Sequence, residues 1–237
     1  MGDSSPRYLI LNRCNTLYMV LSNMNEKFWN TYYTSNEHDI NKPSSFARFI
    51  HQQYLKHTDQ SVKIIADLGS GNCRDSFFFS EKGSECYAID FNLTHVDSVP
   101  NCQFIKQNAV DVMKNDTLQV RFDIIYMRWF LHAMPYADAI DVFESSVKCM
   151  KDDGLMCIEV RSLNDHLLIK ESVYDASDKS YTTTHKRWPF SMGMLEKLSK
   201  ENKCEIIYQN EGYFSENENT ETQNPLLIRF VVKKTRQ

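Results

Sequence analysis

A turn with two glycines lies in the stretch IIADLGSGNCRDSFFFSEKGSECYAIDF (residues 64–91), between an apolar run and an amphipathic one. Such a turn between a strand and a helix typically binds a nucleotide, because the backbone can approach the ligand where side chains are missing. The dinucleotide fingerprint needs a third glycine where this chain has Arg74, and no Gly-Lys-Ser/Thr sequence follows as in a P-loop. Aspartates on both sides of the turn would repel a pyrophosphate. The turn therefore favours a ligand with a positive centre and no phosphate.

S-adenosylmethionine has these properties, and the residues around the turn suit it. Its aminocarboxypropyl arm can lie over Gly69–Gly71. Asp90 ends the next predicted strand, where a carboxylate can accept both ribose hydroxyls, each charge-assisted bond contributing roughly 1.5–3 kcal/mol. The alternative for Asp90 is a solvated strand end. Asp111, in the sequence NAVD, is expected to bind the adenine amino group or, alternatively, to cap a helix.

Short β-rich runs alternate with helical patterns along the middle of the chain. This alternation predicts a parallel sheet with helices on both faces. One helical pattern is expected to stop at Gly83 and another at Gly154. The last two runs have no helix between them, so they predict an antiparallel hairpin. The predicted strands are KIIADL (63–68), ECYAID (85–90), QFIKQ (103–107), FDIIYMR (122–128), GLMCIEVR (154–161), KCEIIYQ (203–209) and LLIRFVVKK (226–234).

The organisation of the chain around this sheet predicts two parts. Residues 1–60 are expected to form an N-terminal helical cap, with two helices between residues 15 and 57, and residues 61–237 the cofactor-binding domain. Residues 162–190 are polar and are expected to form an irregular lid, since loops of that length are commonly functional.

The segments IADLGSGNCRD, YAIDF, NAVD and FDIIYMRWFLHAM resemble the successive motifs of class I S-adenosylmethionine-dependent methyltransferases. The resemblance spans residues 62–161 and implies an α/β fold: a doubly wound, mostly parallel seven-stranded sheet with an antiparallel C-terminal hairpin. The family motif has a further glycine where this chain has Cys73. The segments RWFLHAM, EVRSLNDHL and THKRWPF also resemble a bacterial and viral group linked to sugar and capsular-polysaccharide synthesis.

The resemblance and the motifs together predict the cofactor contacts. S-adenosyl-L-methionine is the expected cofactor. The residues expected to hold it are Asp67, Gly69, Ser70, Gly71, Arg74, Asp90, Phe91, Asn92, Val110, Asp111 and Arg128.

Methylation of a sugar hydroxyl profits from a general base, because the hydroxyl ionises poorly. His132, four residues after Arg128, is the first candidate, with a hydrogen-bonded core histidine as the alternative, and Asp165 and His185 are the next. A divalent metal held by these side chains and Glu159 is a further alternative, although no spacing demands one and none is predicted. Three arginines are expected to grip a diphosphate, unless they form surface ion pairs, and Tyr33 to close over the ligand. The predicted substrate-binding residues are thus Tyr33, Arg128, Arg161 and Arg187.

Composition and missing motifs restrict the acceptor. The net charge is −4, which argues against a nucleic-acid partner, and neither an Asp/Asn-Pro-Pro-Tyr/Phe loop after the fourth strand nor a Pro-Cys dipeptide is present. Seven scattered cysteines without a C-x-x-C pair, the absence of a signal peptide and the absence of a long apolar run predict a cytoplasmic protein without a membrane partner.

The sequence therefore predicts an O-methyltransferase acting on a sugar hydroxyl, with a nucleotide-linked (deoxy)hexose such as UDP-rhamnose or a glycan terminus as acceptor. The alternatives are an RNA or protein methyltransferase and a non-catalytic cofactor-binding module. The sequence leaves open whether the protein is a monomer or a homodimer.

Overall fold

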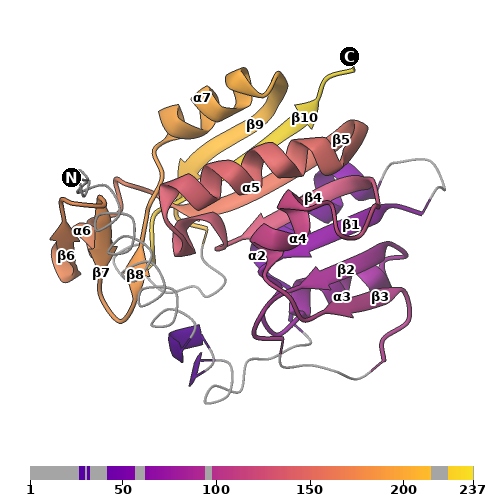
Figure 1. The fold of residues 1–237 in the computed structure, drawn as a ribbon, viewed down its shortest axis with the longest axis horizontal. Helices are drawn as coiled ribbons and strands as arrows, with labels where there is room; N and C mark the ends of the chain where they lie inside the picture. The colour runs from indigo at the N-terminus through magenta and orange to yellow at the C-terminus, as the bar shows by residue number, and fades with distance from the viewer. Residues whose placement is uncertain are drawn as a thin grey trace, which may run out of the picture.

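The computed structural model describes residues 27–29, 31–32, 42–56, 62–93, 98–214 and 224–236. Its centre is a seven-stranded sheet in the order β3-β2-β1-β4-β5-β10-β9 (Figure 1). All strands run parallel except β10, which is antiparallel to both of its neighbours, β5 and β9. The doubly wound sheet and the antiparallel C-terminal hairpin are confirmed. The strands are β1 (Ile64–Leu68), β2 (Glu85–Ile89), β3 (Cys102–Ile105), β4 (Phe122–Arg128), β5 (Met150–Arg161), β9 (Cys204–Gly212) and β10 (Leu227–Lys234).

Helices cover both faces of the sheet and bury its apolar strands. One face packs against α4 (Ala109–Lys114), α5 (Tyr136–Cys149) and α7 (Met192–Glu201), and Figure 1 shows α5 crossing in front of the strands. The other face packs against α2 (Ser45–Ile50) and α3 (Arg74–Glu81). Four of the five residues of both β1 and β2 are buried, as expected for central strands of a parallel sheet.

The N-terminal part of the chain is described only in pieces. Phe46 of α2 is fully buried and stacks on Tyr126 of β4 at 5.2 Å between ring centroids, so α2 shares the core of the sheet. A π-helix, His51–Leu55, follows it. The predicted helix before α2 lies mostly outside the described residues, and the division at residue 60 stays a prediction.

The predicted end of the helix before β5 is wrong. Helix α5 ends at Cys149, and β5 begins at Met150, so Gly154 lies within a strand. A Cβ atom on Gly154 would lie 2.8 Å from the carbonyl oxygen of Lys151 and 3.1 Å from that of Phe122. The glycine therefore permits a close backbone approach and does not cap the helix.

The predicted irregular lid is also corrected by the structure. Residues 162–190 form α6 (His166–Glu171) and a three-stranded antiparallel sheet of β6 (Val173–Asp175), β7 (Ser180–Thr182) and β8 (Lys186–Arg187). Lys186 donates to Asp178 at 2.6 Å and to Asp175 at 3.3 Å, which joins β8 to the β6–β7 turn. Polar hydrogen bonds, which hydrophobic periodicity does not reveal, thus hold this segment together. None of the helices in the described part of the chain has the length and apolar character needed to cross a membrane.

Candidate active site

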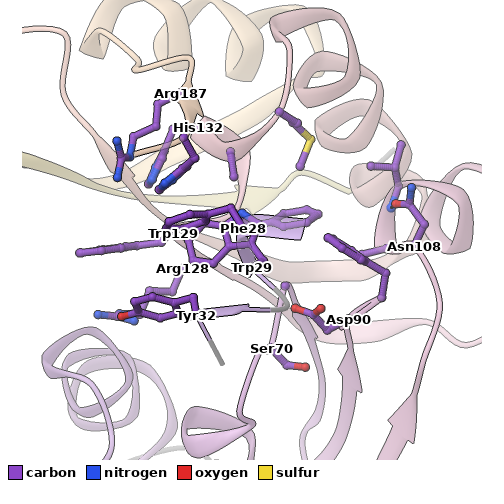
Figure 2. Close-up of a pocket in the computed structure, with 18 of the residues that line it drawn as sticks. Phe28, Trp29, Tyr32, Ser70, Asp90, Asn108, Arg128, Trp129, His132 and Arg187 are labelled. Carbon is purple, nitrogen blue, oxygen red and sulfur yellow. The ribbon is translucent and has the colours of Figure 1, made fainter. Parts of the chain in front are cut away.

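A cavity of about 800 Å³ opens at the carboxyl ends of β1, β2 and β4 (Figure 2). The strand order reverses between β1 and β4, and open α/β sheets bind ligands at such a switch point. One end of the cavity is formed by the glycine turn and the ends of β1 and β2. The other end is formed by the segment after β4, by the small sheet and by the aromatic side chains of Phe28, Trp29 and Tyr32.

The glycine turn has the backbone conformation that its motif predicts. Gly69 has φ +74°, and a Cβ atom there would lie 2.6 Å from Cδ2 of Phe130, a side chain of the cavity wall. Cys73, where the family motif has glycine, also lies in the left-handed region at φ 64°. It is fully buried beside Phe77, so packing holds a conformation that glycine would adopt at less cost. Of the predicted turn residues, Gly69, Ser70 and Arg74 line the cavity.

Asp90 is buried at the end of β2 and fixes the turn from the neighbouring strand. It accepts hydrogen bonds from the backbone N–H of Gly71 at 2.9 Å and of Asn92 at 2.7 Å. Burial raises its pKa, while these two hydrogen bonds oppose the shift. Asp90 also lines the cavity, so the alternative of a solvated strand end is wrong. Asn92 contributes its backbone here but does not line the cavity.

Two further aspartates, the predicted Asp67 and also Asp75, line the cavity. Asp67, at the end of β1, accepts a hydrogen bond from Ser76 at 2.6 Å, and burial, with the nearby charge of Asp75, raises its pKa to about 7. Asp75 accepts from the backbone N–H and the hydroxyl of Ser44, each at 2.7 Å, and from the hydroxyl of Tyr126 at 2.8 Å. Asp75 therefore joins the start of α2 to α3 and β4 at the cavity wall.

The side of the cavity above β3 differs from the prediction. Asn108 caps α4 by accepting from the N–H of Val110 at 2.9 Å, and both residues line the cavity together with Phe91. Asp111 lies in the first turn of α4, exposed and outside the cavity lining, and it is not the cap. Asparagine and aspartate are similarly good N-cap residues, so residue preference alone did not distinguish Asn108 from Asp111.

A buried ion-pair group lies at the ends of β4 and β5. Glu159 is 1% exposed and pairs with Arg128 at 3.2 Å and with Arg229 of β10 at 2.8 Å. Its Oε1 atom also accepts from the indole N–H of Trp129 at 3.1 Å. Trp129 has φ 57°, an uncommon conformation for a bulky residue, and its ring lines the cavity beneath the Arg128 guanidinium. Glu159 thus holds two cations and an indole in place.

His132 lies in a short 3-10 helix, Leu131–Ala133, and lines the cavity. Its Nδ1 atom accepts a hydrogen bond from the backbone N–H of Arg161 at 3.0 Å. Burial, followed by the charges of Arg187 and Arg161, keeps its pKa well below the ordinary value, so the ring is neutral. A neutral ring with Nδ1 as acceptor carries its proton on Nε2. The Nε2–H of His132 is thus free to act as a donor toward the cavity, whereas the lone pair on Nδ1 is occupied and not available to take a proton.

The structure does not bring Asp165 to the cavity. Asp165 is fully buried, caps α6 by accepting from Leu167 at 3.2 Å and is paired with Arg161 through the guanidinium Nε. Neither Asp165 nor Arg161 lines the cavity. Asp165 therefore organises the small sheet segment, and the prediction that these two residues act on the substrate has no support in their positions.

His185 lies in the cavity wall under aromatic side chains. Its ring stacks on Phe28 at 4.0 Å between centroids and meets Trp29 edge-on at 4.9 Å. Burial and the charges of Arg187 and Arg161 lower its pKa to about 3. Its Nε2 atom is buried and has no hydrogen-bond partner among the residues that the structure describes. Phe28, Trp29 and Tyr32 all line the cavity, whereas the predicted Tyr33 lies outside the described residues.

Arg187 also lines the cavity, on the same wall as His132 (Figure 2). Its guanidinium donates to the Thr183 hydroxyl, and burial, with the charge of Arg161, lowers its pKa to about 10. Among the described residues, no three His, Cys, Asp or Glu side chains are grouped so as to hold a metal ion.

Sequence reasoning missed several residues of the cavity wall. Half of them follow β4 or belong to the small-sheet segment, and for those after β4 the position after a strand end was the available signal. The missed lining residues are Phe28, Trp29, Tyr32, Asn72, Asp75, Asn108, Ala109, Tyr126, Trp129, Phe130, Ala133, Met134, Pro135, Asp138, Thr184 and Trp188.

The fold can be compared with solved structures. The 1,6-didemethyltoxoflavin-N1-methyltransferase of Burkholderia thailandensis, crystallised with 1,6-didemethyltoxoflavin and S-adenosylhomocysteine, matches with a TM-score of 0.61 and 12% identity, over 100% of this chain and 93% of that one. The chain has the fold of S-adenosylmethionine-dependent methyltransferases.

Other solved structures agree with this assignment of the fold. A methyltransferase from Anabaena variabilis matches with a TM-score of 0.61 and 14% identity, over 90% of this chain and 94% of that one. The magnesium protoporphyrin IX methyltransferase of Synechocystis, solved with S-adenosylmethionine, matches with a TM-score of 0.55 and 10% identity, over 80% of this chain and 78% of that one. No protein-family model and no curated protein sequence matches the chain.

Proposed function

We propose that the protein is an S-adenosylmethionine-dependent methyltransferase. The observation that carries the proposal is the buried carboxylate of Asp90, which lines the cavity at the switch point of a methyltransferase fold and holds the glycine turn. The residues present also fit the cofactor, because Gly69, Asp90 and Val110 line one continuous cavity of about 800 Å³. Bound S-adenosylmethionine supplies an electrophilic methyl group.

The residues of the cavity suggest how they would hold that cofactor. Asp90 would accept the ribose hydroxyls, and Phe91 with Val110 would enclose the adenine, beside the amide of Asn108. The carboxyl groups of Asp67 and Asp75 also line the cavity, and a ligand with a positive centre would favour the ionised form of Asp67. The predicted adenine contact of Asp111 has no support in its exposed position.

The proposed acceptor is a small molecule with a hydroxyl, and in its finer form a nucleotide-linked sugar. The part of the cavity away from Asp90 has aromatic walls, on which an apolar sugar face can pack, and the cation of Arg187 for a phosphate. Two relatives in fold are named for small-molecule acceptors, 1,6-didemethyltoxoflavin and magnesium protoporphyrin IX. This chain's part in the reaction is to orient the acceptor and to exclude water from the cavity.

Isothermal titration calorimetry with S-adenosylhomocysteine tests the cofactor site. Asp90→Asn keeps the shape of the side chain but removes its charge, and we expect a roughly tenfold to hundredfold weaker affinity. Asp111→Asn is the matched control, because it removes the same charge from an exposed position outside the cavity. Equal affinities of the Asp90 variant and the wild type would contradict the proposed placement of the ribose.

Mass spectrometry of a panel of nucleotide sugars, incubated with the protein and S-adenosylmethionine, tests the acceptor. The expected product is heavier than its substrate by one methylene group. Cofactor binding without turnover on sugars, RNA or protein substrates would instead favour a non-catalytic module. Turnover on RNA or protein alone would contradict the small-molecule acceptor.

A further inference from the structure

Arg187 is a partly buried cation in the cavity wall, and no carboxylate of the described residues forms an ion pair with it. Its hydrogen bond goes to a neutral hydroxyl, that of Thr183. Burial and the charge of Arg161 lower its pKa to about 10, while Asp165 acts in the opposite direction, and the side chain stays charged at neutral pH. A buried charge without a counter-charge is costly, so a site of this kind favours an anion.

The neighbouring carboxylates are already occupied by other arginines. Asp165 is paired with Arg161, and Glu159 is shared by Arg128 and Arg229. Both carboxylates are almost completely buried in these pairs. The anion that Arg187 lacks is therefore not supplied by this part of the described chain, and the cavity that it lines is the place where a ligand can supply it.

His132 adds a second donor on the same wall. Because its Nδ1 atom accepts from the Arg161 backbone, the neutral ring carries its N–H at Nε2, and no described residue accepts from it. The backbone N–H of Trp188 donates to the carbonyl of His132 at 2.8 Å, which places the residue after Arg187 directly against His132. Figure 2 shows the two side chains together, across the cavity from Asp90 and Ser70.

We propose that Arg187 and His132 form an oxyanion-binding subsite that receives a phosphate or carboxylate group of the methyl acceptor. This assigns His132 as a hydrogen-bond donor that positions the acceptor, in place of a general base. The description of the ligand as a methyl acceptor rests on the proposed function, whereas the anion site itself does not. The two ends of the cavity then differ in their polar groups. The cofactor end has the carboxyl groups of Asp67, Asp75 and Asp90, and the acceptor end has two hydrogen-bond donors, Arg187 and His132.

Calorimetric titration of the full chain with inorganic pyrophosphate and with benzoate, each with and without S-adenosylhomocysteine, tests the subsite. The two probes distinguish a phosphate from a carboxylate ligand, and binding of either one supports the proposal. We expect Arg187→Gln to lower the affinity for the probe about ten- to a hundredfold, because a hydrogen bond to a charged group is lost. His132→Phe should lower the affinity for the probe about two- to tenfold, since the imidazole donor is neutral.

The controls separate this proposal from the proposed function. Arg121→Gln removes the same charge from an exposed pair with Asp116, outside the cavity, and should leave the affinity for the probe unchanged. Unchanged S-adenosylhomocysteine affinity in the Arg187 and His132 variants shows that the fold is intact. Failure of the wild type to bind either probe, or an equal loss in the Arg121 variant, would overturn the subsite. An unchanged probe affinity in His132→Phe would show that His132 is not a donor of the subsite and would overturn the proposal in its present form. Failure of the wild type to bind S-adenosylhomocysteine would instead overturn the proposed function.

Discussion

Gly69→Ala is expected to destabilise the protein through two separate effects. The first is backbone strain, because alanine at φ +74° pays about 1–2 kcal/mol. The second is a collision, because the new Cβ would lie 2.6 Å from Cδ2 of Phe130, and moving a side chain in a packed wall costs about 1–3 kcal/mol. We therefore expect a total loss of about 2–5 kcal/mol in the free energy of unfolding.

Gly83→Ala is the matched control for this experiment. Gly83 also has a positive φ, +91°, but a Cβ atom there would meet nothing within 4 Å. The control is therefore destabilised by backbone strain alone, and the difference between the unfolding free energies of the two variants measures the cost of the collision. Urea denaturation gives both free energies, and calorimetry with S-adenosylhomocysteine should show weaker binding only for the Gly69 variant. A Gly69 variant no less stable than the Gly83 variant would refute the view that Phe130 forms a rigid wall over the turn.

Two further predictions concern buried aspartates. The folded-state pKa of Asp67 is raised from 3.8 to about 7, so the native state holds this proton more tightly than the unfolded chain, and stability should fall by up to about 4 kcal/mol as the pH rises through that window. Asp67→Asn should remove this part of the pH dependence in denaturation curves recorded between about pH 4 and pH 8, and parallel curves for the two proteins would contradict the assignment. Asp165→Ala removes the α6 cap and leaves Arg161 without its partner, so we expect a loss of about 3–5 kcal/mol in stability, with unchanged S-adenosylhomocysteine affinity. A large drop in turnover by a variant of normal stability would instead restore Asp165 as a catalytic candidate.

The sheet could be predicted from the sequence because its strands are short apolar runs separated by clear turn signals. β4 was predicted with its observed bounds, Phe122–Arg128, and the two terminal runs do pair as a hairpin. Gly154 misled the prediction of α5, since a glycine after a helical pattern usually marks a C-cap, whereas here it serves close contact between backbones. The small sheet is held by lysine–aspartate pairs, which have no periodic signature.

The cofactor end of the site was more predictable than the acceptor end. Asp90 follows from a general rule, because the carboxyl ends of adjacent parallel strands meet at one edge. The role of His132 depends on which ring nitrogen accepts a hydrogen bond. The donor to its Nδ1 atom is the backbone N–H of Arg161, 29 residues further along the chain. No spacing of residue types contains that information. Asp165 differs, because its contacts are local: it caps α6 and pairs with Arg161, four residues earlier in the chain.

The position of β10 has a consequence for how the protein is made. This strand lies between β5 and β9, yet it is synthesised after the six other strands of the described sheet. It also carries Arg229, one of the two cations that neutralise Glu159. During synthesis from the N-terminus, strands β1 to β5 can assemble first. At that stage the carboxylate of Glu159 still lacks Arg229, one of its two cationic partners. The nascent chain should thus form its glycine turn early and complete the support of Arg128 and Trp129 only when the last strand is inserted.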